Sequence, residues 1–310
     1  MVLLLARSIG RFTLLMVTIT FVVFIAVTLL PGDAASQQLG LRQDEERLAL
    51  LRMELRLDRH PLTRYADWAW GVLCGDFGNV LQTGLPVTQV MAGPLSRTLL
   101  LAALALIAAL LIGTTVGIAA GVNSGSRLDR GLMTGAMLTI STPEFIIGTL
   151  LVLVFAGWLG WLPAVSVLPA GSSLLQQPQL LVLPVCALAL VAGAVLARQF
   201  RALVANEYAR PHIEAARLAG IPEHRVITRH LFPGIAAPAA QLIAGTTPYL
   251  LGGAVVVERV FGFPGLGSLL VQAVNTREPF LTMAATTVIL ALSLIAFLSA
   301  DLLAKKGPKR

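Results

Sequence analysis

The stretch TLLLAALALIAALLIGTTVGIAAGVNSGS, residues 98–126, contains no charged side chain over its 29 residues. About 20 apolar residues in a helix are enough to cross the hydrocarbon core of a bilayer. A water-soluble domain has too little core to bury many runs of this kind. The stretch therefore predicts a membrane-spanning helix, and the sequence on either side decides how many more there are.

Similar apolar runs lie on both sides of this one. The 310 residues are 56% apolar and only 13% charged, with a mean hydropathy of +0.81. The charge-free run from Phe145 to Ala197 is long enough for two crossings, and a segment with Trp158, Trp161, glycines and prolines divides it as an interfacial loop does. We therefore predict an all-α polytopic membrane protein with six spans, at about 10–30, 97–122, 131–157, 179–204, 231–256 and 279–303.

The charged residues predict the orientation of these spans. Six crossings place both termini on one side. If that side is the cytoplasm, the inner segments hold 14 basic and five acidic residues, whereas the outer segments hold nine basic and ten acidic ones. Since Lys and Arg gather in cytoplasmic loops, we expect both termini inside and residues 31–96 outside. The same bias accounts for the net charge of +7 without nucleic acid as a partner.

The first span begins like a secretory signal, because Arg7 and Arg11 precede an apolar run. It is too long for a signal and lacks a small-residue cleavage site, so we expect it to remain as a helix. In the outer segment, acidic residues followed by spaced leucines predict an amphipathic helix over residues 44–58. A structural cap on the outer mouth is the simplest interpretation of that segment, and a ligand site is the alternative.

Residues 205–230 contain a short helix with clear ends. Arg210 precedes a proline and is biased toward extended backbone, while Pro211 suits the first helical position. Glu214 lies near the positive end of the helix dipole. Gly220 is placed to follow the last turn, and Pro222 prevents continuation. The result is an isolated helix of about nine residues between two spans.

A helix of that length is too short to persist alone in water, so it must dock against something. Ala215, Ala216 and Ala219 allow close approach to a groove, and Ile213 and Leu218 supply apolar contacts. A helix lying on the bilayer surface is the alternative, although such helices usually present a bulky apolar face. The pattern favours docking on a partner protein.

The run Glu214-Ala215-Ala216, followed by Gly220, resembles the EAA loop of ABC importer permeases. His230-Leu231-Phe232 with Pro238 resembles the run that follows this loop in the dipeptide, oligopeptide and nickel subfamily. Pro233 and Gly234 depart from that run, where Arg and Asn are usual. Further motifs in family order are Pro31-Gly32-Asp33, Gly75-Asp76-Phe77-Gly78, Leu128-Asp129-Arg130, Ser141-Thr142-Pro143-Glu144-Phe145, and Gly253 to Glu258 with Phe261 and Pro264-Gly265-Leu266-Gly267.

This resemblance implies a type I ABC importer transmembrane domain. It divides the chain into an N-terminal spanning helix (1–30), an extracytoplasmic segment (31–96), the transmembrane domain (97–304) with a coupling helix at about 211–220, and a basic cytoplasmic tail (305–310). In the family the coupling helix inserts into the cytoplasmic ATPase, which assigns ATPase coupling to Glu214, Ala215, Ala216, Arg217, Gly220 and Ile221.

The resemblance also implies what the chain does and with which partners. It would be a permease subunit of a bacterial inner-membrane importer, forming half of the pathway for dipeptides or oligopeptides. The implied partners are a homologous second permease, two ABC ATPase subunits that hold ATP and Mg²⁺, and an extracytoplasmic binding protein. Nickel or a metal–chelator complex remains an alternative substrate. A stand-alone channel or secondary transporter is the alternative class, but it would be expected to contain an internal repeat, which the sequence does not show.

Signatures of catalysis are missing from the sequence. The four histidines form no H-E-x-x-H pair, and neither G-x-S-x-G nor the phosphate-binding G-x-x-x-x-G-K-[ST] occurs. We therefore expect no catalytic residue, no metal and no cofactor on this chain, which would make it a transport subunit rather than an enzyme.

One ionisable residue, Glu144, lies well inside a predicted span. A carboxylate in the bilayer is expensive and by default indicates a functional site. We place Glu144 on the translocation path, where it would meet a cationic group such as an amino terminus. A hydrogen-bonded glutamate facing another helix is the alternative. The other candidate path residues are Pro143 and Phe145 beside it, and Phe261 and Pro264 in a re-entrant plug or an ordinary turn.

Two arginines, Arg198 and Arg201, close the fourth predicted span at its inner end. Cations are favourable at the C-terminus of a helix. They are candidates for a basic inner mouth that faces the ATPase or a partner subunit, and simple topological anchoring is the alternative.

Overall fold

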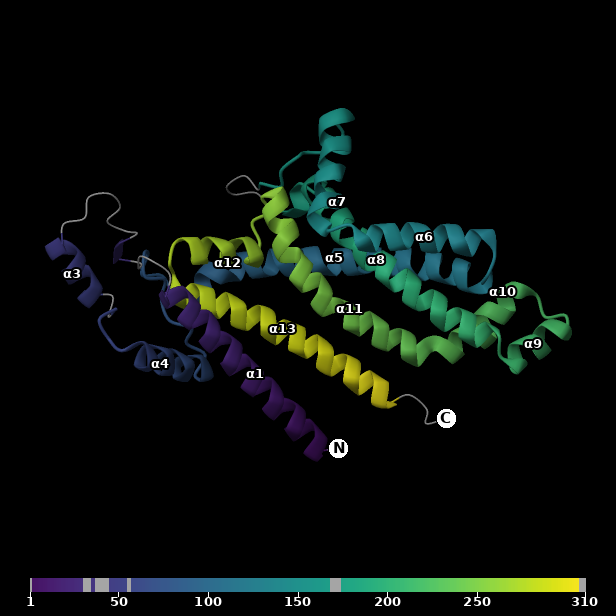
Figure 1. Ribbon diagram of the computed structural model, residues 1–310, viewed down its shortest axis with the longest axis horizontal. Helices are drawn as coiled ribbons and strands as arrows, with labels where there is room; N and C mark the ends of the chain where they lie inside the picture. The colour runs from purple at the N-terminus through teal and green to yellow at the C-terminus, as the bar shows by residue number, and fades with distance from the viewer. Residues whose placement is uncertain (1, 30–34, 37–44, 55–56, 168–173, 307–310) are drawn as a thin grey trace. The chain divides into compact units, whose positions relative to one another are not determined.

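The computed structural model describes residues 2–29, 35–36, 45–54, 57–167 and 174–306 (Figure 1). Within these ranges the chain is almost entirely helical, and its only strand-like pairing is an isolated antiparallel bridge between Asn79 and Pro86. The predicted motif at residues 31–33 lies outside the described residues.

Five helices of the described residues are long and apolar enough to cross a membrane, and a bent pair makes a sixth crossing if its two halves form one span. This agrees with the predicted fold class. The five are α1 (Val2–Leu29), α5 (Val87–Val122), α8 (Gln179–Tyr208), α11 (Phe232–Phe261) and α13 (Pro279–Lys306); the bent pair is α6 (Arg127–Ser141) and α7 (Glu144–Leu151), the latter continued by the π-helix η1 (Val152–Trp158).

The third span is not the straight helix predicted at 131–157. Its two halves meet at an angle of 102°, and the cause is Pro143. The residue before a proline is pushed toward extended backbone, and Thr142 has φ −96° and ψ 121°. Pro143 also lacks the N–H that would continue the ladder of hydrogen bonds. Glu144 is therefore the first residue of α7 and not the middle of a continuous helix.

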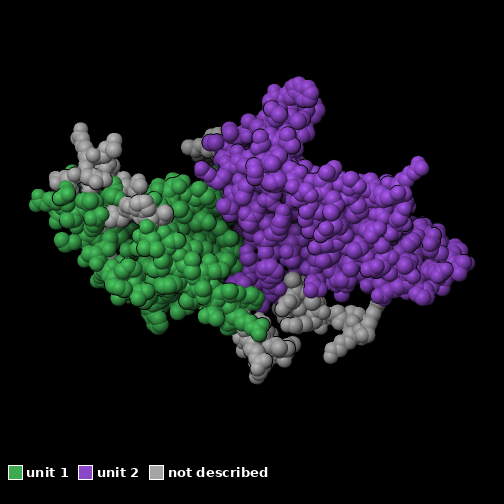
Figure 2. Space-filling model, viewed as in Figure 1, with its two compact units in different colours: residues 1–97, 264–292 green, residues 98–263, 293–310 purple. Residues whose placement is uncertain are grey.

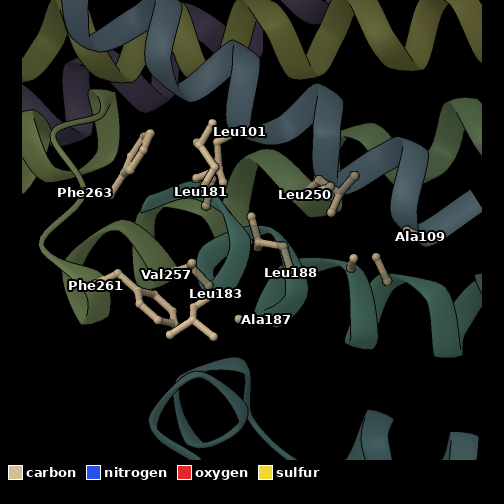
Figure 3. Packing of buried hydrophobic residues seen from close by; sticks show 14 of the residues in the cluster. Leu101, Ala109, Leu181, Leu183, Ala187, Leu188, Leu250, Val257, Phe261 and Phe263 are labelled. Atoms are coloured by element: carbon tan, nitrogen blue, oxygen red, sulfur yellow. The ribbon is translucent and has the colours of Figure 1, made fainter. Parts of the chain in front are cut away.

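The chain forms two compact units, coloured separately in Figure 2. The larger comprises residues 98–263 and 293–310. Its core contains side chains from α5, α7, α8 and α11, including Leu101, Leu188, Leu250 and Phe261 (Figure 3). All four are buried. This core holds the long helices of the unit together.

Glycines allow α5 and α8 to approach closely. Gly113, Gly117 and Gly121 recur at every fourth position and so share one face of α5. A Cβ at Gly117 would lie 2.5 Å from the Cβ of Phe200, a separation that atoms cannot adopt. Such small-residue spacing is typical of tightly packed helices in membranes.

The smaller unit comprises residues 1–97 and 264–292. It contains α3 (Glu45–Glu54), α4 (Pro61–Leu73) and α12 (Leu266–Asn275) besides parts of the long helices. Trp68 packs with Phe24 and Met283. The helix predicted at 44–58 is shorter, and α3 buries no residue; residues 44, 55 and 56 lie outside the described part.

The carboxylate of Glu278 holds one loop of this smaller unit through hydrogen bonds. Glu278 accepts hydrogen bonds from the N–H groups of Leu81 (2.9 Å) and Gln82 (2.8 Å). Burial raises the pKa of Glu278, and the two N–H donors oppose that rise. The loop after α4 is thus tied to the start of α13.

Candidate functional site

The docking helix predicted from the sequence is α9 (Pro211–Leu218). Arg210 precedes it with extended backbone, φ −78° and ψ 147°, and Pro211 is its first residue, as predicted. Gly220 has φ +77°, the left-handed conformation predicted for it. Gly220 N–H donates to Arg217 O (3.0 Å) and Ile221 N–H to Ala216 O (3.2 Å), which is the Schellman end of a helix. Ile221 therefore belongs to the helix cap.

One side of α9 packs on the chain itself. Ile213 is fully buried and Ala216 is 7% exposed, in a cluster with Val204, Val226 and Leu231. These neighbours come from α8 and from η3 (Val226–Leu231), which follows the short α10 (Glu223–Arg225). The expectation that Ala216 and Ile213 face an ATPase is therefore corrected: in this structure they anchor α9 to the rest of its own unit.

The opposite side of α9 is exposed. Glu214, Ala215 and Arg217 are all exposed, and Leu218 is 83% exposed. An apolar side chain, a small one and a carboxylate thus lie together on a helix whose ends are fixed. This face is available for docking.

Ion pairs hold α9 from both ends. Glu207, buried at the end of α8, accepts from Arg210 Nε at 3.1 Å, and its other oxygen lies 3.6 Å from His212 Nε2. At the far end, the Arg217 guanidinium lies 3.6 Å from a Glu223 oxygen and 5.0 Å from the centre of the Tyr208 ring. Arg217 is thus engaged within the chain.

Gly234 explains a departure from the family motif. A Cβ at this position would lie 2.2 Å from Glu207 Oε1. The side chain usual at this position in the resembling family would therefore displace the Glu207 carboxylate that holds α9. Glycine is the residue that leaves room for it.

The two candidate inner-mouth arginines differ. Arg201 makes a two-pronged ion pair with the buried Asp129, Nε to Oδ1 at 3.0 Å and Nη2 to Oδ2 at 2.7 Å. Gly125 N–H also donates to Asp129, at 2.8 Å. Arg201 therefore joins α8 to the start of α6 and is not free to face a partner. Arg198 is exposed.

Glu144, at the bend of the third span, lies against α11. Its two carboxylate oxygens are so near Gly253 that a Cβ there would be 2.8 Å from each. Its carboxylate is also hydrogen-bonded to Tyr249. Pro143 makes the bend, and Phe145 points outward with half of its surface exposed. A half-buried carboxylate thus lies beside a tyrosine hydroxyl within the spans.

Phe261 does not line a path in this structure. It is fully buried in the core of the larger unit, and a Cβ on Gly148 of α7 would lie 3.2 Å from its ring. Gly262 then ends α11 with φ +61°. Pro264, in the smaller unit, is half-buried, and its carbonyl accepts from Arg97 Nη1 at 3.0 Å.

A hollow of about 480 Å³ opens beside Tyr249, among residues that no sequence motif marks as a site. Its polar lining comes from Gln199, Gln241, Thr246 and Tyr249. The sequence does contain a signal for this hollow, because uncharged amides lie inside the predicted spans. Such amides are missed when only charged residues are considered.

Comparison with known proteins identifies a matching family and several relatives. A family model described as "Binding-protein-dependent transport system inner membrane component" matches residues 113–306, and one described as its N-terminal region matches residues 1–87. A protein of Brucella abortus named as a peptide transport system permease is 33% identical over 263 residues, which is 85% of this chain and 84% of that protein. The glutathione transport system permease protein GsiC of Salmonella typhimurium is 35% identical over 266 residues, 86% and 84% of the two chains.

Proposed function

Because the chain belongs to the family of binding-protein-dependent transport system inner membrane components, we propose that it forms half of the translocation pathway of an ATP-driven importer of short peptides. The similar proteins are named for peptide and glutathione transport, and glutathione is itself a tripeptide. The chain is a multi-pass transport subunit of the inner membrane and not an enzyme. Nickel or metal–chelator import, the alternative left open by the sequence, is not needed to account for this similarity.

The exposed face of α9 is the observation that carries the mechanism. The helix is fixed by its caps, by the cluster around Ile213 and by ion pairs at both ends. It presents Glu214, Ala215 and Leu218 outward. A rigid helix with one leucine and one carboxylate suits a groove on another protein better than a bilayer surface, which requires a bulky apolar face.

We assign that groove to an ABC ATPase. The sequence contains no phosphate-binding loop of its own, so ATP and Mg²⁺ belong to two ATPase subunits. When these close, α9 transmits the movement to α8 through Glu207 and to α11 through η3. A second, homologous permease completes the pathway, and an extracytoplasmic binding protein delivers the peptide. The excess of basic residues in the predicted inner loops supports a cytoplasmic position for both termini and α9, with residues 31–96 outside.

The test is whether the exposed leucine of α9 is needed for assembly. We expect Leu218→Asp to abolish co-purification of the ATPase with the tagged chain, because a charge would be buried without a partner in the groove. The matched control is Leu73→Asp, since Leu73 is 79% exposed but lies on α4 in the predicted outer segment. The control should retain the ATPase, and both variants should reach the membrane in normal amounts.

Equal retention of the ATPase by Leu218→Asp and Leu73→Asp would show that α9 is a surface feature. Transport by the purified chain without any ATPase would instead favour a channel or secondary transporter.

A further inference from the structure

The hollow beside Tyr249 lies among three helices of the larger unit. Val195 and Gln199 come from α8, Phe297 comes from α13, and the remaining lining comes from α11. Its volume of about 480 Å³ is within the range of pockets that bind small organic ligands, roughly 300–1,000 Å³. A ligand the size of a short peptide fragment fits such a space.

Polar side chains interrupt a lining that is otherwise apolar. Gln199 and Gln241 each carry an amide with two donor hydrogens and an acceptor oxygen. Within the described part of the chain, neither amide has a hydrogen-bond partner. An amide left unpaired in hydrocarbon is costly, and polar side chains inside spans face the protein interior or a water-filled cavity. The hollow therefore opens toward water or a ligand rather than toward lipid.

The polar surface continues along one face of α11. Gln241, Gly245, Tyr249 and Gly253 follow one another at four-residue spacing, which keeps them on the same side of a helix. Twelve residues of helix rise about 18 Å, so the face runs through much of a bilayer core of about 30 Å. At its far end the Glu144 carboxylate lies against Gly253 and is bonded to Tyr249.

The chemistry of this face matches one class of ligand. A primary amide presents the same donor and acceptor as a peptide group, so it can pair with a peptide backbone whatever its side chains. Among the described residues, no charged side chain lines the hollow itself, which makes a bare metal ion or a phosphate a poor fit. Glu144, next to Tyr249, supplies a negative charge, and a protonated amino terminus is its natural counter-ion.

We propose that this hollow binds the backbone of a peptide in transit, with Gln199 and Gln241 bonding its peptide groups and the Glu144–Tyr249 pair receiving its amino terminus. The proposal rests on the proposed function and assigns the place within the chain where the substrate is held. A second permease subunit covering the same face is the competing occupant. The two amides of the lining favour a peptide, because peptide groups supply the matching donors and acceptors.

Photo-crosslinking distinguishes the two occupants. The complete importer is reconstituted with its ATPase, its binding protein and the variant Gln241→p-benzoylphenylalanine, and isotope-labelled trialanine is supplied with ATP. We expect a light-dependent adduct between this chain and trialanine. An adduct formed only with the second permease would overturn the proposal and make this face a subunit interface.

Uptake of trialanine gives a second, independent readout. Loss of one neutral hydrogen bond predicts about a five-fold lower uptake for Gln241→Leu, and loss of a charged one predicts at least about ten-fold for Glu144→Gln. Gln89→Leu is the matched control, because Gln89 is an exposed glutamine of α5 outside the hollow, and its uptake should equal that of the wild type. ATPase co-purification verifies that each variant assembles.

Uptake by Gln241→Leu and Glu144→Gln equal to that of Gln89→Leu would overturn the proposal while leaving the importer function intact. If the unmodified importer takes up neither trialanine nor glutathione nor any member of a tripeptide mixture, the proposed function itself fails, and the hollow fails with it.

Discussion

Two glycines determine the geometry around α9 at the scale of single residues, for different reasons. Gly220 has open space around it but a positive φ of +77°, so its backbone conformation disfavours residues that carry a Cβ. Gly234 has helical backbone but no space, because the Glu207 carboxylate lies where a Cβ would be. The first glycine ends the docking helix and the second keeps its anchor in place.

Replacing Gly220 tests the positive φ alone. We expect Gly220→Ala to disfavour the end of α9 by about 1 kcal/mol, which corresponds to roughly five-fold less ATPase retained at limiting concentration. Gly131→Ala is the control, since Gly131 of α6 also has open space around it but no positive φ. The comparison is made by quantitative pull-down, and equal retention by the two variants would contradict the role of φ.

The lack of space at Gly234 is tested by changing its neighbour Glu207 as well. Overpacking predicts that Gly234→Ala lowers the free energy of unfolding by about 1–3 kcal/mol. In a Glu207→Ala background the added methyl group has room, so the same change should have little effect. Thermal unfolding of the four proteins in detergent measures this coupling. Equal losses in both backgrounds would show that the two residues do not compete for space.

The ends of α9 could be predicted from sequence, whereas its faces could not. Proline before a helix and glycine after it act through local backbone chemistry, so Pro211 and Gly220 are predictable from their neighbours alone. Which side of α9 faces the chain depends on Val204, Val226 and Leu231, which lie elsewhere in the sequence. The small size of Ala216 indicated close packing, but the sequence did not reveal that the packing is internal.

At the scale of elements, the third span is bent in its middle, and the start of its first helix, α6, is held in place by contacts with α8. Pro143 bends it through 102° and brings Glu144 to a helix end. At the other end of α6, Asp129 is bound by Arg201 of α8 and by the N–H of Gly125. The sequence indicated both Pro143 and Glu144, but the continuous apolar run around them suggested a straight helix. An apolar pattern indicates burial, but it carries little information about the direction of the helix axis.

The Asp129–Arg201 pair is predicted to be a strong link between α6 and α8. Removing one partner of a buried ion pair typically costs about 3–5 kcal/mol, so Asp129→Ala should markedly lower the unfolding temperature. Asp67→Ala is the control, because the Asp67–Arg59 pair is exposed and 3.6 Å apart and should contribute at most about 1 kcal/mol. Similar unfolding temperatures for the two variants would show that Arg201 is only an anchor for topology.

For the whole molecule, composition and charge predicted the class of fold because the bilayer constrains both. Spans must be helical and about 20 residues long, and basic loops stay inside. The number and positions of the spans were therefore accessible from the sequence. The hollow beside Tyr249 was not, because its polar residues come from three helices whose packing no local pattern specifies.

The orientation of the chain can be measured by thiol labelling. In a background with Cys74→Ser and Cys186→Ala, a membrane-impermeant reagent added to spheroplasts should label Leu62→Cys but not His224→Cys, and both positions are exposed. Permeabilised membranes should label both, which verifies that each thiol is reactive. Labelling of His224→Cys alone in intact spheroplasts would reverse the predicted topology.

The glycine face of α5 also has a consequence for how the protein is made. Gly113, Gly117 and Gly121 form a groove into which α8 packs, yet α8 begins at Gln179, long after α5 ends at Val122. At synthesis rates of about 5–20 residues per second, α5 leaves the ribosome roughly 3–10 s before its partner. During that interval the groove is covered by acyl chains or by the insertion machinery. Biogenesis of this subunit therefore includes a step in which α8 displaces lipid or the insertion machinery from the groove of α5.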